Sequence, residues 1–382
     1  MKTFNLFTSL VVLGFALSSC DPIEPIPDPS ACIELSGSQS TPLVLTNHNA
    51  DPNDADYCVT GDFNIRADVV VEPGVTILMK NGAKIEVQTG GSFKSVGTET
   101  EKITIRGEEL LEKGQWEYIR FRTNDTDNRL EYTNITGGGS DPTYDANVFI
   151  AYDGYAKIDH CYVGFSQSNG IKCENQDSNL GGIANTDISF CDLYPISIDA
   201  RHLPNIESTN TGTGNTYDKI DVEGSQLTNP FTWKKSPFLP YHINGTLAFT
   251  NAVTVQPGTS IFMAGGANIQ ISSSGSFNCV GTASEKIRIM GDNMINGSWE
   301  YIRFFDSSST QNRFEHCIIS YGGGDNTWEG MITLVYSSYC RIGNSEIKGS
   351  ARYGVQNLND QATFVDDGNN TWSDNTLGRL GN

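Results

Sequence analysis

The sequence of 382 residues has little positive charge: 25 lysines and arginines stand against 45 aspartates and glutamates, giving a net charge of −20. An acidic surface repels phosphate backbones, so we expect no nucleic-acid partner. Histidine is scarce, with five residues, and no serine–histidine–aspartate set is indicated. Beyond the N-terminal apolar segment, no apolar run is long enough for a transmembrane helix.

The nine cysteines include no pair with the two-residue spacing typical of zinc sites. Cys32 and Cys58 flank the start of the folded part and are candidates for a disulfide in an oxidising compartment. We expect no cofactor and no metal. The loop NDTDN at 124–128 has alternating oxygen side chains that suit calcium. The matching loop at 306–312 loses most carboxylates, which favours a solvated turn.

The N-terminal segment is typical of a secretory signal, because Lys2 precedes an apolar run at 6–17 that is too short to span a bilayer. The stretch LSSC at 17–20 resembles the lipobox of bacterial lipoproteins, whose cysteine is acylated, and Cys20 has that place here. The following DPIEPIPDPS is rich in proline and acid, which predicts an extended tether. By resemblance to Bacteroidetes-type lipoproteins, we expect an outer-membrane lipoprotein, periplasmic or surface-exposed, held to the membrane by its lipid.

A long internal repeat dominates the rest of the chain. The stretch VEPGVTILMKNGAKIEV at 71–87 returns as VQPGTSIFMAGGANIQI at 255–271, and the match extends without a gap over 57–107 and 241–291. It continues through WEYIRF at 116–121 and 299–304. We therefore predict a tandem duplication, with module 1 at 57–240 and module 2 at 241–382, preceded by a signal at 1–19 and a tether and N-terminal cap at 20–56.

A finer period lies within the modules. LEYTNI at 130–135, IDHCYV at 158–163 and ISFCDL at 188–193 are alternating segments with apolar ends, separated by turn residues. Such a pattern predicts one coil per repeat of a β-solenoid. Stacking would place Ile135, Val163 and Leu193 in one inner column, and Thr133, Cys161 and Cys191 in another. Cys161, Cys191 and Cys317 are then small core residues, although Cys161 and Cys191 would lie close enough to bridge.

The two modules differ in length. GNTY at 214–217 is similar to NNTW at 369–372, at an offset near 155 instead of 184. This predicts that module 2 is about one coil shorter and that the extra coil of module 1 lies around 174–200. The whole rod would have about a dozen coils and a length of roughly 55–60 Å.

The repeated elements YCVTGDFNI, VVVEPGVTILM and GQWEYIRF are similar to those of right-handed parallel β-helix proteins of Gram-negative cell surfaces. The resemblance covers nearly all of 57–382 and implies an all-β, single-stranded right-handed β-helix, a pectin-lyase-like fold. That fold carries lyases, hydrolases, adhesins and proteins without known activity, so the resemblance fixes no function.

Catalytic motifs of β-helix enzymes are incomplete here. NTD occurs at 185–187 and a pair of aspartates at 366–367, but they fall in different modules, and the GHG and RIK elements of polygalacturonases are absent. Inverting glycosidases need two carboxylates across one groove. His160 and His316 share a repeat position with Tyr132, Phe190 and Asn344, which indicates a packing or surface position. We therefore expect no catalytic residue.

The polar set retained most strongly between the copies is WEYIRF, together with Arg129/Glu131 and Arg313/Glu315. One interpretation is a structural charge ladder in which Arg120 lies beside Glu131. The other is a glycan-binding strip in which aromatic faces meet sugar rings. Its residues would be Trp116, Tyr118, Arg120, Trp299, Tyr301 and Arg303.

These observations favour a monomeric, non-catalytic surface protein that binds polysaccharide or another surface protein. A polysaccharide lyase or glycoside hydrolase is the alternative, and a structural spacer is the third.

Overall fold

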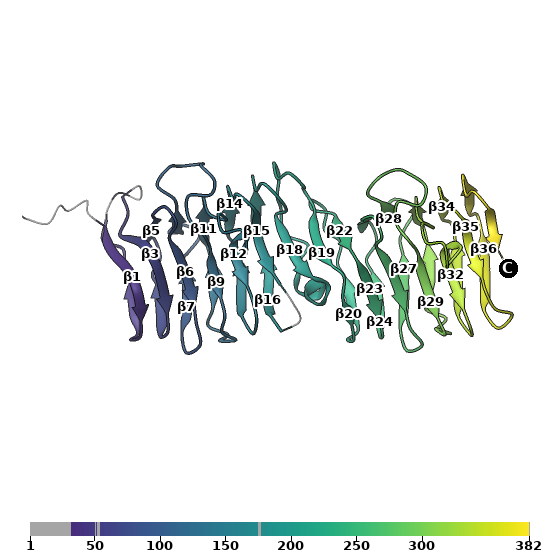
Figure 1. The fold of residues 1–382 in the computed structure, drawn as a ribbon, viewed down its shortest axis with the longest axis horizontal. Helices are drawn as coiled ribbons and strands as arrows, with labels where there is room; N and C mark the ends of the chain where they lie inside the picture. Colours follow the sequence, from purple (N-terminus) through teal and green to yellow (C-terminus); the bar gives the residue numbers. More distant parts are fainter. Residues whose placement is uncertain (1–31, 50, 52–53, 175–176, 382) are drawn as a thin grey trace, which may run out of the picture.

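The computed structural model of the chain describes residues 32–381 except 50, 52–53 and 175–176. It is an all-β rod, a right-handed parallel β-helix of about 14 turns (Figure 1). The predicted fold class is thus confirmed, with slightly more coils than the dozen expected. Cys20 and the tether at 21–30 lie outside the described residues.

Each coil of module 1 contributes strands to three faces. The first face contains β3 (Tyr57–Ile65), β5 (Thr76–Met79), β8 (Ile103–Arg106), β11 (Thr133–Thr136), β14 (Tyr162–Gly164) and β17 (Asp187–Ser189). The second face contains β1 (Ile33–Gln39), β6 (Lys84–Val87), β9 (Ile119–Phe121), β12 (Ala146–Ile150), β15 (Asn169–Cys173) and β18 (Ile196–Asp199). The third face contains β2 (Leu43–Leu45), β4 (Asp68–Val71), β7 (Ser92–Val96), β10 (Arg129–Glu131), β13 (Tyr155–Asp159) and β16 (Asn179–Ala184). β1 and β3 bend, and each belongs to both the first and the second face.

Module 2 repeats this arrangement after a junction that contains the 3₁₀ helix η1 (Ala200–Asn205), β19 (Ile220–Glu223), β20 (Gln226–Leu227) and β21 (Phe231–Trp233). Its first face contains β22 (Tyr241–Asn244), β25 (Ser260–Met263), β28 (Ile287–Gly291), β31 (Cys317–Ser320), β34 (Glu346–Lys348) and β37 (Thr371–Ser373). Its second face contains β23 (Thr246–Phe249), β26 (Asn268–Ile271), β29 (Ile302–Phe305), β32 (Gly330–Val335), β35 (Tyr353–Asn357) and β38 (Gly378–Gly381). Its third face contains β24 (Ala252–Val255), β27 (Ser276–Val280), β30 (Arg313–Glu315), β33 (Tyr339–Gly343) and β36 (Thr363–Gly368).

The core consists of inward side chains that stack from coil to coil. On the first face of module 1, Ile77, Ile105, Ile135, Val163 and Ile188 pair in register and are fully buried. Burying each such side chain contributes about 1.5–3 kcal/mol, which one coil alone cannot obtain.

This column corrects one sequence alignment. The predicted pairing of Ile135 with Val163 is confirmed, but Ile188 takes the place expected for Leu193, which is partly exposed. The stretches 183–188 and 188–193 both begin and end with apolar residues, and the coil uses the earlier one.

The extra length of module 1 also lies elsewhere than predicted. β16 and β17 begin at 179 and 187, and β36 and β37 begin at 363 and 371, which is 184 positions later in both cases. The coil at 174–200 therefore has a counterpart in module 2. The additional chain of module 1 lies at 200–240, in the junction.

The junction rotates the repeat by one face. β18 pairs with β19, and β19 pairs with β22, so the second face of module 1 continues directly into the first face of module 2. β22 itself pairs with β25, as the equivalent part of β3 pairs with β5. Equivalent surfaces of the two modules therefore point in different directions around the rod.

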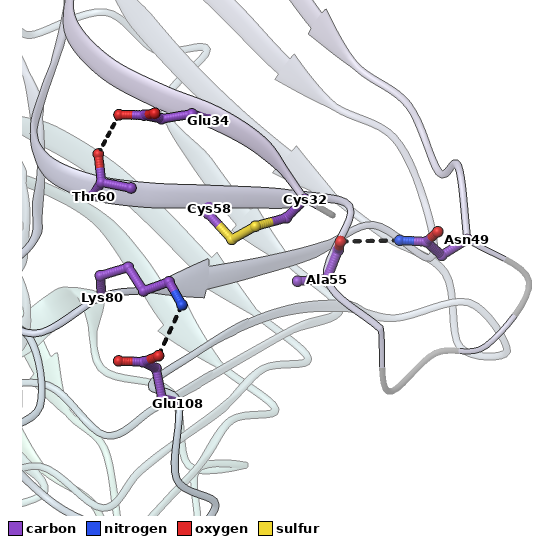
Figure 2. The surroundings of a disulfide bond; sticks show 8 residues. All are labelled: Cys32, Glu34, Asn49, Ala55, Cys58, Thr60, Lys80 and Glu108. Atoms are coloured by element: carbon purple, nitrogen blue, oxygen red, sulfur yellow. Dashed lines mark hydrogen bonds and ion pairs between the residues drawn. A yellow bond between two sulfur atoms is a disulfide. The ribbon is translucent and has the colours of Figure 1, made fainter. Parts of the chain in front are cut away.

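A disulfide closes the N-terminal end. Cys32 and Cys58, the pair singled out from the sequence, are bonded and have Cα atoms 5.6 Å apart. The bond joins β1 to β3, and beside it the Thr60 hydroxyl donates to Glu34 Oε1 at 2.6 Å (Figure 2). It cross-links the first described coil, whose β1 pairs with β3 alone among the strands that the structure describes.

Candidate functional site

Trp116 and Trp299, two of the residues proposed to meet sugars, lie in the core with no exposed surface. Their indole N–H groups donate to the Thr136 and Ser320 carbonyls at 2.9 and 2.8 Å. Each ring lies against a glycine of a three-glycine run, at 137–139 or 322–324, and an added Cβ at Gly138 would come within 2.7 Å of Trp116. The prediction that these indoles present faces to a ligand is wrong, because both are packing residues.

Tyr118 and Arg120 form a second retained structural unit. Both are buried, and the Arg120 guanidinium lies 3.8 Å from the centroid of Tyr144 and 5.2 Å from that of Tyr118. Arg120 forms an ion pair with Glu86 on the neighbouring coil. The predicted Arg120–Glu131 ladder is wrong, because β9 belongs to the second face and β10, which carries Glu131, to the third.

The Glu86 carboxylate also pairs with Arg122 at 3.0 Å. Burial by itself raises the pKa of Glu86, but the hydrogen bond from Arg122 and the charge of Arg120 outweigh it, and the pKa lies below its usual value. The carboxylate is therefore ionised at neutral pH and neutralises the buried Arg120.

Tyr301 and Arg303 hold the equivalent places on the second face of module 2. Tyr301 is buried, and Arg303 lies 5.3 Å from its centroid and 4.6 Å from that of Trp328, the counterpart of Tyr144. In both modules an aspartate, Asp141 or Asp325, accepts the backbone N–H of this covering aromatic residue at 2.8 Å. The retained set thus builds an aromatic cage around an arginine.

An open hollow of about 480 Å³ lies on the first face of module 1. The residues at its base continue a ladder of outward side chains, which pair from coil to coil in the order Thr104, Asn134, Tyr162, Asp187 and Thr211. A second hollow of about 240 Å³, which contains Thr76 and Thr104, shares Lys102 with the first. We call the two together the first-face groove.

One wall of the groove is aromatic. Tyr132 and His160 stack with centroids 4.7 Å apart and an interplanar angle of 19°. Both lie at the corner between the third and first faces in the left-handed region, with φ of 47° and 53°, and Asn185 follows at 49°. A corner of this kind favours residues that tolerate positive φ, of which asparagine is one.

Polar groups around this wall are held in fixed places. The Asp159 carboxylate lies 2.8 Å from His160 Nδ1 and accepts a hydrogen bond from Asn185 Nδ2 at 2.9 Å. Burial raises the pKa of Asp159, but the Asn185 hydrogen bond and the charges of His160 and Lys157 lower it by more. The pKa of Asp159 therefore lies below its usual value. Burial, aided by Asp187, raises the pKa of Tyr162 to about 12, so its phenol is a hydrogen-bond donor at neutral pH.

The corresponding surface of module 2 is different. Lys286 and Glu346, which stand where module 1 has Lys102 and Tyr162, form an ion pair at 2.9 Å. Asn344 stands in place of His160, and His316 in place of Tyr132. A charge pair between neighbouring side chains thus lies where module 1 has an open aromatic and polar groove.

The histidine column predicted from the repeat is confirmed only in part. Tyr132, His160, His316 and Asn344 all occupy left-handed corners. Phe190 does not belong with them, because it stacks on Phe165 at another corner with centroids 5.1 Å apart. The alignment error that misplaced Leu193 also misplaced Phe190.

Cys161 and Cys191 are free thiols, as are Cys173, Cys279, Cys317 and Cys340, and all six are buried. Burial raises the pKa of Cys161 and of Cys191 to about 12. The predicted column of Thr133, Cys161 and Cys191 is wrong in its third member, since the Cys161 N–H donates to Thr186 Oγ1, and Thr186 is the next residue of that column.

Asp187 and Asp366, from the NTD and DD motifs, lie in β17 and β36 of different modules, as the sequence analysis expected. In the 124–128 loop Asp125 Oδ1 accepts the Asp127 N–H at 2.9 Å, the hydrogen bond of an Asx turn. Within the described part of the chain, no group of three or more histidines, cysteines or acids is placed to hold a metal ion. Among the described residues, no helix has the length and hydrophobicity to cross a bilayer.

No protein-family model, no curated protein and no solved structure matches this chain. The groove residues differ between the two copies, whereas the residues predicted to bind are those that both copies retain. A comparison of what they do not share, such as Tyr162 against Glu346 or His160 against Asn344, would have pointed to the groove.

Proposed function

We propose that the protein is a non-catalytic polysaccharide-binding protein of the bacterial cell envelope and that the first-face groove of module 1 is its binding site. The observation that carries this proposal is the stacked pair Tyr132–His160 beside the polar ladder of the first face. Sugar rings pack against aromatic faces, and their hydroxyl groups exchange hydrogen bonds with threonine, asparagine and aspartate side chains.

The groove suits an extended polymer better than a compact ligand. Its ladder residues repeat once per coil, at a spacing of about 4.8 Å, which is close to the rise of one sugar unit in an extended chain. Lys102 belongs to both hollows, so a polymer along the rod would pass from one to the other. A fixed surface of this kind binds a polymer without the entropy loss of ordering a loop.

A second candidate is polysaccharide cleavage in the same groove. Glu99 and Asp187 both line the larger hollow, and glycoside hydrolysis uses two carboxyl groups on either side of the bond. A lyase reaction with Tyr162 as its base is disfavoured, because the raised pKa of this residue keeps its phenol protonated. Binding without cleavage is the function we favour.

We also propose that the chain is attached to the outer membrane through a lipid on Cys20. The support is the order of basic, apolar and small residues before this cysteine and the proline-rich acidic segment after it. Metabolic labelling with an alkyne fatty acid tests it: wild type should incorporate the label and Cys20→Ala should not. Labelling of Cys20→Ala would refute it.

Native affinity electrophoresis of the mature chain, in gels that contain plant, host or bacterial polysaccharides, tests the groove. His160→Asn and Tyr162→Glu install the residues of module 2 and should abolish retardation by the polymer that wild type binds. His316→Asn changes the equivalent corner of module 2 and should have no effect. Equal retardation of all four proteins would place binding elsewhere.

Chain length of the recovered polymer separates binding from cleavage. Intact polymer supports binding without cleavage. If wild type shortens the polymer and Glu99→Gln leaves it intact, the protein is an enzyme. If a broad panel gives neither retardation nor shortening, a role as adhesin or spacer replaces both.

A further inference from the structure

One strand of the second face carries a pair of charges in module 1 that module 2 lacks. In module 1, β6 reads KIEV, and its counterpart β26 in module 2 reads NIQI. Lys84, which pairs with Glu117 at 2.9 Å, is replaced by Asn268, which donates to Glu300 at 2.7 Å. Glu86, which pairs with Arg120, is replaced by Gln270.

This exchange leaves Arg303 without a counter-ion. Its Nη2 donates to the neutral Gln270 Oε1 at 2.7 Å, and no acid among the described residues lies within ion-pair distance of it. Its Nε is buried and has no hydrogen-bond partner in the described part of the chain. A guanidinium offers five N–H donors and prefers a carboxylate, so this partly buried cation is under-used.

A hollow of about 210 Å³ opens beside Arg303. Ala248, Phe249 and Ile271 give it an apolar base, and Gln226, Thr250 and Ser272 add amide and hydroxyl groups. Phe305, which is 39% exposed, forms a further wall, and the Arg303 guanidinium lies 5.6 Å from its centroid. The hollow thus combines a ring to stack on, a rim of neutral polar groups and one cation.

Module 1 shows how a carboxylate meets the equivalent arginine. There the Glu86 carboxylate meets the caged Arg120, and Arg122 stands where module 2 has Phe305. The protein therefore already binds a carboxylate against this arginine once, using its own side chain. In module 2 the carboxylate is missing, the Gln270 amide oxygen accepts from Arg303 in its place, and the hollow opens beside this pair.

We propose that the hollow beside Arg303 binds one acidic sugar, a uronic acid unit, with its carboxylate on the Arg303 guanidinium and its ring against Phe305. The carboxylate is indicated by the lost glutamate. The sugar is indicated by the exposed aromatic ring with a neutral amide and hydroxyl rim. The site is independent of the proposed function of the groove, because it lies in the other module and on a different face.

Isothermal titration of the mature chain with D-glucuronate, at an ionic strength of about 0.05 M, tests the proposal. We expect a Kd of about 1 mM, which is the weak end of the affinity scale. Acetate and D-glucose, which each supply only one half of the ligand, should bind at least tenfold more weakly. Equal affinity for acetate would overturn the sugar component, and absence of heat at 20 mM glucuronate would overturn the site.

Gln270→Glu is the decisive variant, since it restores the residue of module 1. It should reduce glucuronate affinity at least tenfold while leaving the melting temperature equal or higher, which separates occupation of the site from unfolding. Arg303→Gln should lose affinity to a similar degree. Tyr162→Glu, in the groove, should leave glucuronate binding unchanged, so failure of the groove proposal and failure of this one are distinguishable. Unchanged affinity in Gln270→Glu would refute the proposal.

Discussion

The two modules carry the same aromatic cage around an arginine. In module 1 the arginine pairs with Glu86, whereas in module 2 Gln270 takes the place of that glutamate. The first faces differ in the opposite sense, because an open groove at Tyr162 in module 1 corresponds to a Lys286–Glu346 ion pair in module 2. Trp116 and Trp299, which stayed identical after duplication, are buried. The diverged residue Phe305 lies outward, where a ligand would meet it.

The rotation at the junction gives this divergence a geometric consequence. Because the second face of module 1 runs into the first face of module 2, a straight polymer on one side of the rod never meets the same face twice. Selection on one surface therefore does not constrain its counterpart, and the two copies are free to specialise.

The largest effect should come from the shared core. Trp116→Ala and Trp299→Ala each remove a fully buried indole and should cost about 3–5 kcal/mol. Because coils of a solenoid contact only their neighbours, the loss should be local. Hydrogen exchange of β9 and β29 measures it, and loss of protection in both modules is expected. A cost below 1 kcal/mol at either site would show that this module does not need its indole to fold.

The next largest effect should come from making module 1 resemble module 2. Glu86→Gln leaves Arg120 buried without its carboxylate and should cost on the order of 2–3 kcal/mol. The pKa of Glu86 is lower folded than unfolded, so its contribution is complete above the unfolded pKa and disappears as pH falls through the folded value.

Urea unfolding of wild type and Glu86→Gln between pH 3 and 7 tests this second prediction. The difference between them should be constant near neutral pH and shrink in the acid range. A difference that does not depend on pH would mean that the ion pair contributes nothing beyond packing. Gln270→Glu, the opposite exchange, should not destabilise.

A smaller effect is expected from closing the groove. Tyr162→Glu places a carboxylate where Glu346 lies in module 2, so that it can pair with Lys102. Affinity for the bound polysaccharide should fall at least tenfold, about 1.4 kcal/mol, with little change in stability. Affinity titration and thermal unfolding of the same sample measure both. Retained affinity would show that the difference between the first faces has no role in binding.

The sequence predicted the architecture because periodic apolar residues must point inward in every coil, and Ile135 and Val163 do so. It misplaced Leu193 and Phe190, because two overlapping stretches satisfy the same pattern and only the stacking of neighbouring coils chooses between them. It also could not reveal the rotation at the junction, since pairing of β19 with both β18 and β22 is a relation between coils.

The site was less predictable than the fold for a related reason. Retained polar and aromatic residues were interpreted as surface groups, but Arg120 and Trp116 are buried. The alternation of inward and outward residues along a strand does not predict which outward residues a loop will cover. The groove residue His160 was interpreted as a packing or surface position, since its repeat position accepts several residue types. Whether the corner at His160 faces a groove depends on the preceding coil, where Tyr132 stacks on it.

The smallest effect should come from exchanging the residues of the inner corner. Cys161 is a neutral thiol whose Sγ lies 3.1 Å from the Leu130 carbonyl oxygen, and its counterpart Ser345 accepts the Cys317 N–H at 2.9 Å. Cys161→Ser and Ser345→Cys should each change stability by less than about 1 kcal/mol, because both side chains fill the corner and reach a backbone carbonyl. Urea unfolding measures the change, and a thiol reagent should label Cys161 only after unfolding, since burial raises its pKa to about 12. Rapid labelling of Cys161 in the native protein would show that this corner opens, and that the coil beneath the groove is less rigid than its counterpart in module 2.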